Sequence, residues 1–78
     1  KLSMMVDARN IILEKIKSKA SDIEDNNIGD TTLENLNIDS LEFMELIMEI
    51  EDDLNISITE EQIDPDLTVS EFIRRLVP

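Results

Sequence analysis

Three short motifs that start α-helices recur in the second half of this 78-residue chain. Each places an Asp or Thr three residues before a Glu or Gln, at Asp39–Glu42, Thr59–Gln62 and Thr68–Glu71. In such a capping box, the first side chain accepts a hydrogen bond from the free backbone N–H groups of the first turn, and the later side chain bonds back. The motifs therefore predict three helix starts.

Apolar residues recur at helical spacing in the first segment as well. From Ser3 to about Lys19 they are three, four or seven positions apart, which is typical of an amphipathic helix; they are Met5, Val6, Ile12, Leu13 and Ile16. The lysines near its end, Lys15, Lys17 and Lys19, suit the negative pole of the helix dipole. The residues from Ser21 to about Ile38 are polar and turn-rich, and they predict a long loop with its own apolar anchors.

The capping motifs complete the predicted fold. The second helix should run from its cap Asp39 to about Leu54 or Asn55, a short third helix should follow Thr59 and stop at Pro65, and a last one should follow Thr68. We expect one domain over residues 1–78. It should be an all-α, small antiparallel four-helix bundle with one short helix and a long loop between the first and second helices.

The charge of the chain excludes some functions. Nineteen acidic residues against seven basic ones leave a net charge of −12, which is too negative for a protein that neutralises nucleic-acid phosphates or anionic lipids. Between Lys19 and Arg74 there is no basic residue at all. We therefore expect basic protein partners, and no nucleic acid or membrane.

Two residue types that often carry chemistry are absent. Without cysteine or histidine, the chain lacks a thiol nucleophile, thiolate metal ligands and the commonest general base. The acidic stretch from Asp22 to Asn27 is similar to a calcium loop, but it has Asn27 and Leu33 where that loop needs Gly and Glu. We expect no metal site and no enzyme activity. No apolar run is long enough to span a membrane, so we expect a monomeric cytoplasmic protein.

Ser40 is the residue of most interest. A serine in the first turn of a helix has its hydroxyl near unpaired backbone amides and the positive end of the helix dipole, where a phosphate is stabilised. Taken alone, it also fits an ordinary helix-start serine.

The residues around Ser40 are similar to a known motif. Leu36-Asn37-Ile38-Asp39-Ser40-Leu41 resembles the attachment motif of acyl carrier proteins, in which Asp-Ser-Leu follows a Leu-Gly-x turn and precedes an acidic helix. The resemblance continues through residues 42–58 and Thr68-Val69, and so covers essentially the whole chain. Asn37 departs from the family's Gly, but Asn tolerates the left-handed conformation better than other residues with a β-carbon.

The resemblance implies a function. A phosphopantetheinyl transferase would attach the 4′-phosphopantetheine of coenzyme A to Ser40, with Asp39 capping the helix and assisting the transferase. The chain would carry acyl groups as thioesters to acyl-transferring and chain-elongating enzymes with basic patches, in fatty acid, polyketide, lipid A or related biosynthesis. An aminoacyl or peptidyl carrier domain, and an unmodified acidic helical adaptor, stay open as alternatives. Whether the chain is a free-standing protein or a domain of a larger one also stays open.

The acidic second helix is the expected docking surface. Projection of residues 40–54 at about 100° per residue places a core face opposite a row of acids, with Leu41, Met44 and Met48 between the two. The expected partner-contacting residues are Leu41, Glu42, Met44, Glu45, Met48, Glu49, Glu51 and Asp52. For Met44, a role in core packing is an equal alternative.

Overall fold

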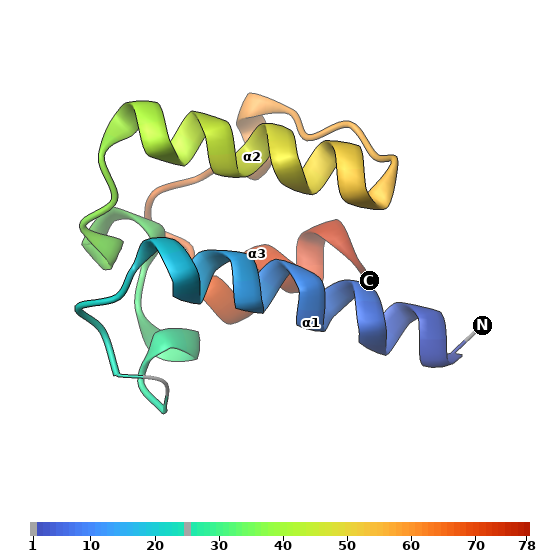
Figure 1. Cartoon of the computed structure of the whole chain (residues 1–78), viewed down its shortest axis with the longest axis horizontal. Coiled ribbons are helices and arrows are strands. Elements are labelled where there is room, and N and C mark those ends of the chain that lie inside the picture. Colours follow the sequence, from blue (N-terminus) through green and yellow to red (C-terminus); the bar gives the residue numbers. More distant parts are fainter. Residues whose placement is uncertain (1, 25) are drawn as a thin grey trace.

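Three α-helices are present in the computed structural model, which describes the backbone of residues 2–24 and 26–78 and the side chains of residues 8–24 and 26–78. They are α1 (Leu2–Lys19), α2 (Ser40–Leu54) and α3 (Val69–Leu76). Short 3-10 turns lie in the connections: η1 (Ile28–Asp30), η2 (Leu33–Leu36) and η3 (Glu60–Gln62). α1 runs antiparallel to α2 and packs on both α2 and α3 (Figure 1). The all-helical prediction is confirmed; the side chains of Met5 and Val6 lie outside the described residues.

The predicted short third helix is not confirmed as an α-helix. The segment after Thr59 forms only the three-residue turn η3, although its cap is present: Thr59 N–H donates to Gln62 Oε1 at 2.9 Å. Ile63 already leaves helical geometry, with φ −100° and ψ 62°. Pro65 follows closely and disfavours helical geometry at Asp64, so the turn has no room to grow into a helix.

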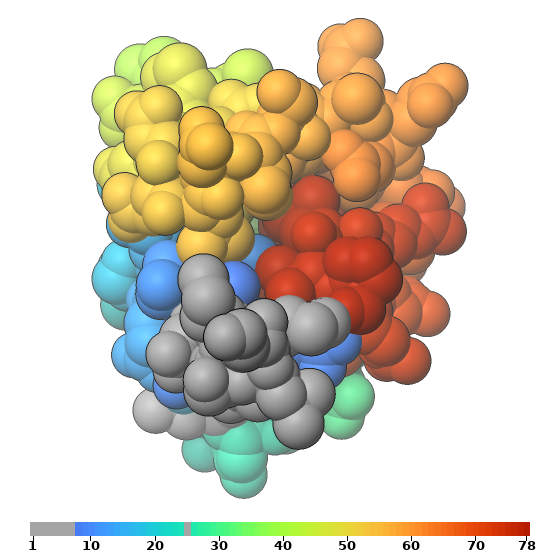
Figure 2. Space-filling model, turned by 90° about the vertical axis from the view of Figure 1, so that its right-hand side faces the viewer, coloured from blue at the N-terminus to red at the C-terminus, as the bar shows by residue number. Residues whose placement is uncertain are grey.

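The core is aliphatic around a single aromatic ring. Its fully covered side chains come from all three helices and from η2, and they are Ile12, Ile16, Leu36, Leu46, Ile50, Val69 and Phe72. Among the described residues no charged side chain is buried, and the only buried polar side-chain atom without a hydrogen bond is Thr32 Oγ1. The charged side chains of the described residues therefore lie at the surface. Figure 2 shows that α2 and the segment after it form one side of the molecule.

The long loop between α1 and α2 is fixed to the segment that leads into α3. Leu33 N–H donates to Leu67 O at 2.9 Å, and Val69 N–H donates to Thr31 O at 2.9 Å, around an isolated bridge between Thr32 and Thr68. Within this loop, the side chains of Leu33 and Leu36 of η2 are buried. The loop thus forms a fixed support for the start of α2.

Candidate functional site

Ser40 is the first residue of α2 and its side chain is exposed. Asp39 caps the helix: its Oδ2 accepts the N–H of Leu41 at 3.2 Å, and its carbonyl accepts the N–H of Phe43 at 2.8 Å. The capping box expected here forms only in part, because no hydrogen bond joins Glu42 to Asp39 in the described part of the chain. The Asp39 carboxylate accepts the N–H of Leu41, the second residue of the helix, rather than that of Glu42, the third.

A left-handed residue brings the chain into this helix. Asn37, directly after η2, has φ 58° and ψ 35°, which is the conformation expected for the position where the family has Gly. The buried Leu36 fixes the chain before the turn, and the exposed Asp39 and Ser40 follow it. Asn37 thus turns the chain from the core to an exposed helix start.

The surroundings of Ser40 suit a phosphodiester. The first N–H groups of a helix lack intrahelical partners, and the helix dipole places partial positive charge there. The exposed Ser40 hydroxyl makes no hydrogen bond within the described residues. A phosphate on this oxygen would lie in a favourable local field despite the negative net charge.

An open, mostly apolar pocket of about 250 Å³ begins at Ser40. Its walls come from the long loop, the first turns of α2 and the η3 segment, and they are Leu33, Glu34, Ile38, Ser40, Phe43, Ile63 and Pro65. A second open pocket of about 440 Å³ lies further along α2, against Ile58 and Glu60. Both pockets share Phe43 and Ile63, so they adjoin and together form a mostly apolar seam between α2 and the segment around η3. Helical periodicity carries no signal for this seam, because the seam depends on how the segment after α2 lies beside the helix in the folded chain.

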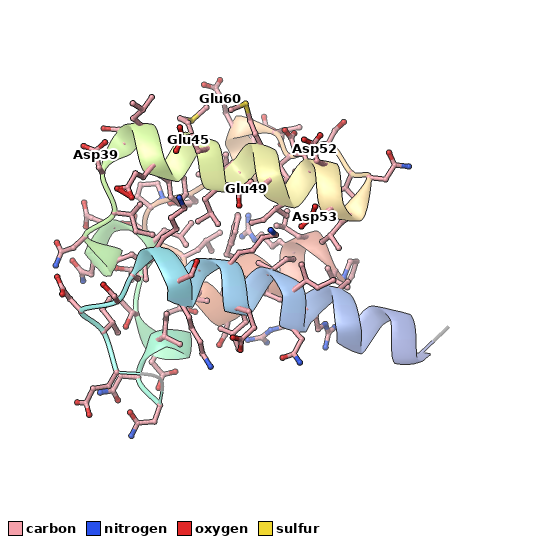
Figure 3. All side chains as sticks on the ribbon, viewed as in Figure 1. Asp39, Glu45, Glu49, Asp52, Asp53 and Glu60 are labelled. Carbon is pink, nitrogen blue, oxygen red and sulfur yellow. The ribbon has the colours of Figure 1, made fainter. Side chains whose placement is uncertain are left out.

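Three large apolar side chains lie exposed in a row on α2. Leu41 is 70%, Met44 53% and Met48 54% exposed. Glu42, Glu45 and Asp52 are exposed on the same helix, and Figure 3 shows Glu45 and Asp52 along its outer side. The structure therefore brings together most of the expected docking residues.

Two of the expected docking acids have partners within the chain. Glu49 shares Lys15 of α1 with Asp53, at 3.6 Å and 2.7 Å respectively. Glu51 is half-buried, and its Oε2 accepts the N–H of Ile58 at 2.8 Å, which ties the loop after α2 to the helix. Helical periodicity placed Glu49 with the other acids, but it carried no signal for the lysine that α1 brings beside it.

Two titratable groups are shifted by local contacts. The hydrogen bond from Lys15 to Asp53 raises the pKa of the Lys15 ammonium. At the start of α3, the backbone N–H of Thr68 bonds to the Glu71 carboxylate and lowers its pKa. Within the described residues, no group of three acidic side chains is arranged to hold a metal ion. None of the helices in that part of the chain has the length and apolarity of a membrane-spanning helix.

Comparison with known proteins adds independent evidence. A family model described as a phosphopantetheine attachment site matches residues 9–76. An acyl carrier protein of Chlamydia caviae is 35% identical over 92% of this chain and 90% of its own length. An acyl carrier protein of Exiguobacterium sibiricum is 33% identical over 94% of this chain and 89% of its own length. No solved structure gives a significant match.

Proposed function

Because the chain belongs to the acyl carrier protein family of phosphopantetheine-binding proteins, we propose that its 4′-phosphopantetheine is attached to Ser40 and that Ser40 is the only attachment point. Like its family, the chain is a non-catalytic carrier of acyl groups. The observation that carries the assignment to Ser40 is its exposed hydroxyl at the start of α2, directly after the cap Asp39.

Attachment is a phosphoryl-group transfer in which Ser40 is the acceptor. The Ser40 oxygen forms a bond to the phosphorus that carries the pantetheine arm, and the P–O bond to the nucleotide part of coenzyme A breaks. The hydroxyl proton passes to a base of the transferase, since the chain has no histidine and the carboxylate of Asp39 is engaged as the helix cap. The new phosphodiester is then held at the positive pole of α2.

The arm supplies the thiol that this cysteine-free chain lacks. The acyl group bound to it would shelter in the apolar seam that begins at Ser40 and passes Phe43 and Ile63. Burial of each methylene is worth about 0.8 kcal/mol, so a short chain in this seam would be protected and still extractable. Both pockets are open to solvent, so the acyl chain would be covered without being fully enclosed.

The partner surface in this proposal is the exposed face of α2. Acidic side chains attract a basic patch over distance, and Leu41, Met44 and Met48 offer apolar contact once the partner arrives. The partners would be a phosphopantetheinyl transferase and acyl-transferring or chain-elongating enzymes of fatty acid, polyketide or related lipid biosynthesis. The dense acidity of α2 favours this type of carrier over an aminoacyl or peptidyl one.

The proposal retains the monomeric cytoplasmic carrier expected from the sequence. A monomer of this shape has a Cα radius of gyration of 11.6 Å, which small-angle X-ray scattering tests.

Modification by a transferase distinguishes this carrier from an unmodified adaptor. We expect incubation with coenzyme A, Mg²⁺ and a broad-specificity phosphopantetheinyl transferase to add one arm, seen in the intact mass. Because the chain has no cysteine, a thiol reagent should detect one thiol per chain after loading and none before. A chain that gains neither mass nor thiol, with a control carrier loaded in parallel, would be an adaptor rather than a carrier.

A further inference from the structure

Lys15 reaches from α1 to two carboxylates of α2. Its Nζ lies 2.7 Å from Asp53 Oδ2 and 3.6 Å from Glu49 Oε1. Figure 3 shows Glu49 and Asp53 on the side of α2 that faces α1. The Lys15 side chain is only 23% exposed, against 51% for Glu49 and 49% for Asp53. Lys15 therefore stands at the edge of the contact between the two helices.

The acids of α2 consequently fall into two pairs. Glu45 and Asp52 are two turns apart, and their directions around the helix differ by about 20°. They lie beside the exposed Leu41 and Met48, and neither has a basic partner within the described residues. Glu49 and Asp53, rotated toward α1, share Lys15.

We propose that Lys15 determines which carboxylates of α2 a basic partner meets: it holds Glu49 and Asp53 at the α1 edge and leaves Glu45 and Asp52 as the docking pair. The inference rests on the proposed function, in which α2 docks basic enzymes. A cation approaching Glu49 or Asp53 competes with an ammonium that is already in contact, whereas Glu45 and Asp52 have no ion-pair partner in the described part of the chain. The raised pKa of Lys15 keeps it charged throughout the physiological range.

This arrangement also describes the partner. Seven residues of helix rise about 10 Å, so the matching surface would carry two cationic groups about 10 Å apart. Beside these two groups it would need apolar recesses for Leu41, which precedes Glu45, and for Met48, which lies between Glu45 and Asp52. Such a surface is a protein patch rather than a single ion.

The test removes one charge at a time from each pair. Glu45→Gln or Asp52→Asn should slow association with a phosphopantetheinyl transferase about two- to fivefold at low ionic strength. Glu49→Gln or Asp53→Asn should change it less than about 1.5-fold, because Lys15 already contacts both carboxylates and offsets one of their two charges. Stopped-flow fluorescence with a labelled carrier measures these rates, and circular dichroism verifies that each variant is folded.

Lys15 variants then test the cause. In a Lys15→Gln background, Glu49→Gln should slow association as much as Glu45→Gln does, because Glu49 has become free. Lys15→Arg should restore the contrast between the two pairs. Lys17→Gln is the matched control, since Lys17 pairs with Glu14 of its own helix at 3.5 Å and its removal costs the same net charge.

Two results would overturn the inference. One is an equal slowing by Glu49→Gln and Glu45→Gln in the parent; the other is the same contrast in Lys15→Gln as in Lys17→Gln. A parent that is never loaded would defeat the proposed function instead.

In that case the pairing is tested by adding a hexalysine peptide and recording the carboxyl-carbon NMR signals of the four acids. The signals of Glu45 and Asp52 should shift most in the parent, and those of all four acids should shift in Lys15→Gln. Equal shifts of the four acids in the parent would reject the pairing.

Discussion

Asn37 is the residue on which the geometry of the attachment site most depends. Its left-handed backbone, with φ 58°, joins the buried Leu36 to the cap of α2. For a residue with an ordinary β-carbon this conformation costs about 1 kcal/mol or more in free energy. The cost is smaller for Asn and smallest for Gly. The turn is therefore retained here without the glycine of the family motif.

We expect Asn37→Ala to lower the free energy of unfolding by about 1 kcal/mol, because alanine retains the β-carbon and loses the tolerance of Asn for this region. Urea denaturation measures the change. Asn35→Ala is the matched control, since Asn35 is exposed in η2 and does not have a positive φ. Equal losses from both variants would show that the left-handed turn is not what makes Asn37 important.

At the scale of the helices, α3 has a more complete cap than α2, the other helix whose cap the structure describes. Thr68 Oγ1 accepts the N–H of Glu71 at 3.2 Å, and Glu71 Oε1 accepts the N–H of Thr68 at 3.0 Å. The bond from the Thr68 backbone is the main cause of the lowered pKa of Glu71, and Arg74 and Arg75 contribute in the same direction. Folding therefore favours the charged form of this carboxylate.

This cap predicts an acid-sensitive contribution to stability. The unfolded chain protonates Glu71 at its ordinary pKa, and the folded chain only at a lower pH. The contribution is thus fully present above the ordinary pKa and is lost as the pH falls through the lowered one. Melting temperature against pH should fall less steeply on the acid side for Glu71→Gln than for the parent. The exposed Glu61, replaced by Gln, is the control; an unchanged slope in Glu71→Gln would contradict the role of this cap.

On α2, charge and apolar contact should act on different steps of docking. Reversing Glu45 to Lys should slow association with the transferase, most visibly at low salt, because the acidic row steers the encounter. Truncating Met48 to Ala should weaken the docked complex with little change in its salt dependence. Association and dissociation rates measured at two ionic strengths separate these effects. An association rate of Glu45→Lys equal to that of the parent at low salt, with helicity intact, would place the partner surface on another helix.

The sequence predicted the helices better than it predicted the roles of the acids. Local signals sufficed for the ends of α2, where Asp39 caps the start and Asn55, with φ 55°, ends the helix. The short third helix, predicted to follow Thr59 and to stop at Pro65, is present only as the capped three-residue turn η3, because Pro65 limits it more than the sequence pattern suggested. The sequence could not predict that Glu49 has an ion-pair partner and Glu45 does not within the described residues. That difference depends on Lys15, which is distant in the sequence and lies beside Glu49 only after the helices pack.

At the scale of the whole molecule, repulsion among the acidic residues destabilises the folded state. Seventeen of the nineteen acids lie between Lys19 and Arg74, where there is no basic residue. Of the described lysines and arginines, only Lys15 forms an ion pair with an acid of α2. Much of the mutual repulsion is therefore left to the solvent to screen.

Raising the salt concentration from a few millimolar to about 0.5 M should raise the melting temperature, because the Debye length then falls below the spacing of most surface charges. MgCl₂ at matched ionic strength should give a similar rise, since no group of three acids in the described residues is arranged to hold a metal. Calorimetry measures both. A melting temperature indifferent to salt would show that the acids are too far apart to repel, and a much larger rise with Mg²⁺ would reveal a specific site.

The proposed roles of the apolar seam and of the docking face of α2 both require that the phosphopantetheine arm is attached to Ser40. The most direct measurement is the intact mass of the parent, Ser40→Ala and Ser70→Ala after incubation with coenzyme A, Mg²⁺ and a competent transferase. Ser70 is the matched control, because it is an exposed serine in the first turn of α3. We expect the parent and Ser70→Ala each to gain the mass of one phosphopantetheinyl group, and Ser40→Ala to stay folded and unmodified. A gain of that mass by Ser40→Ala would contradict the assignment of the attachment site.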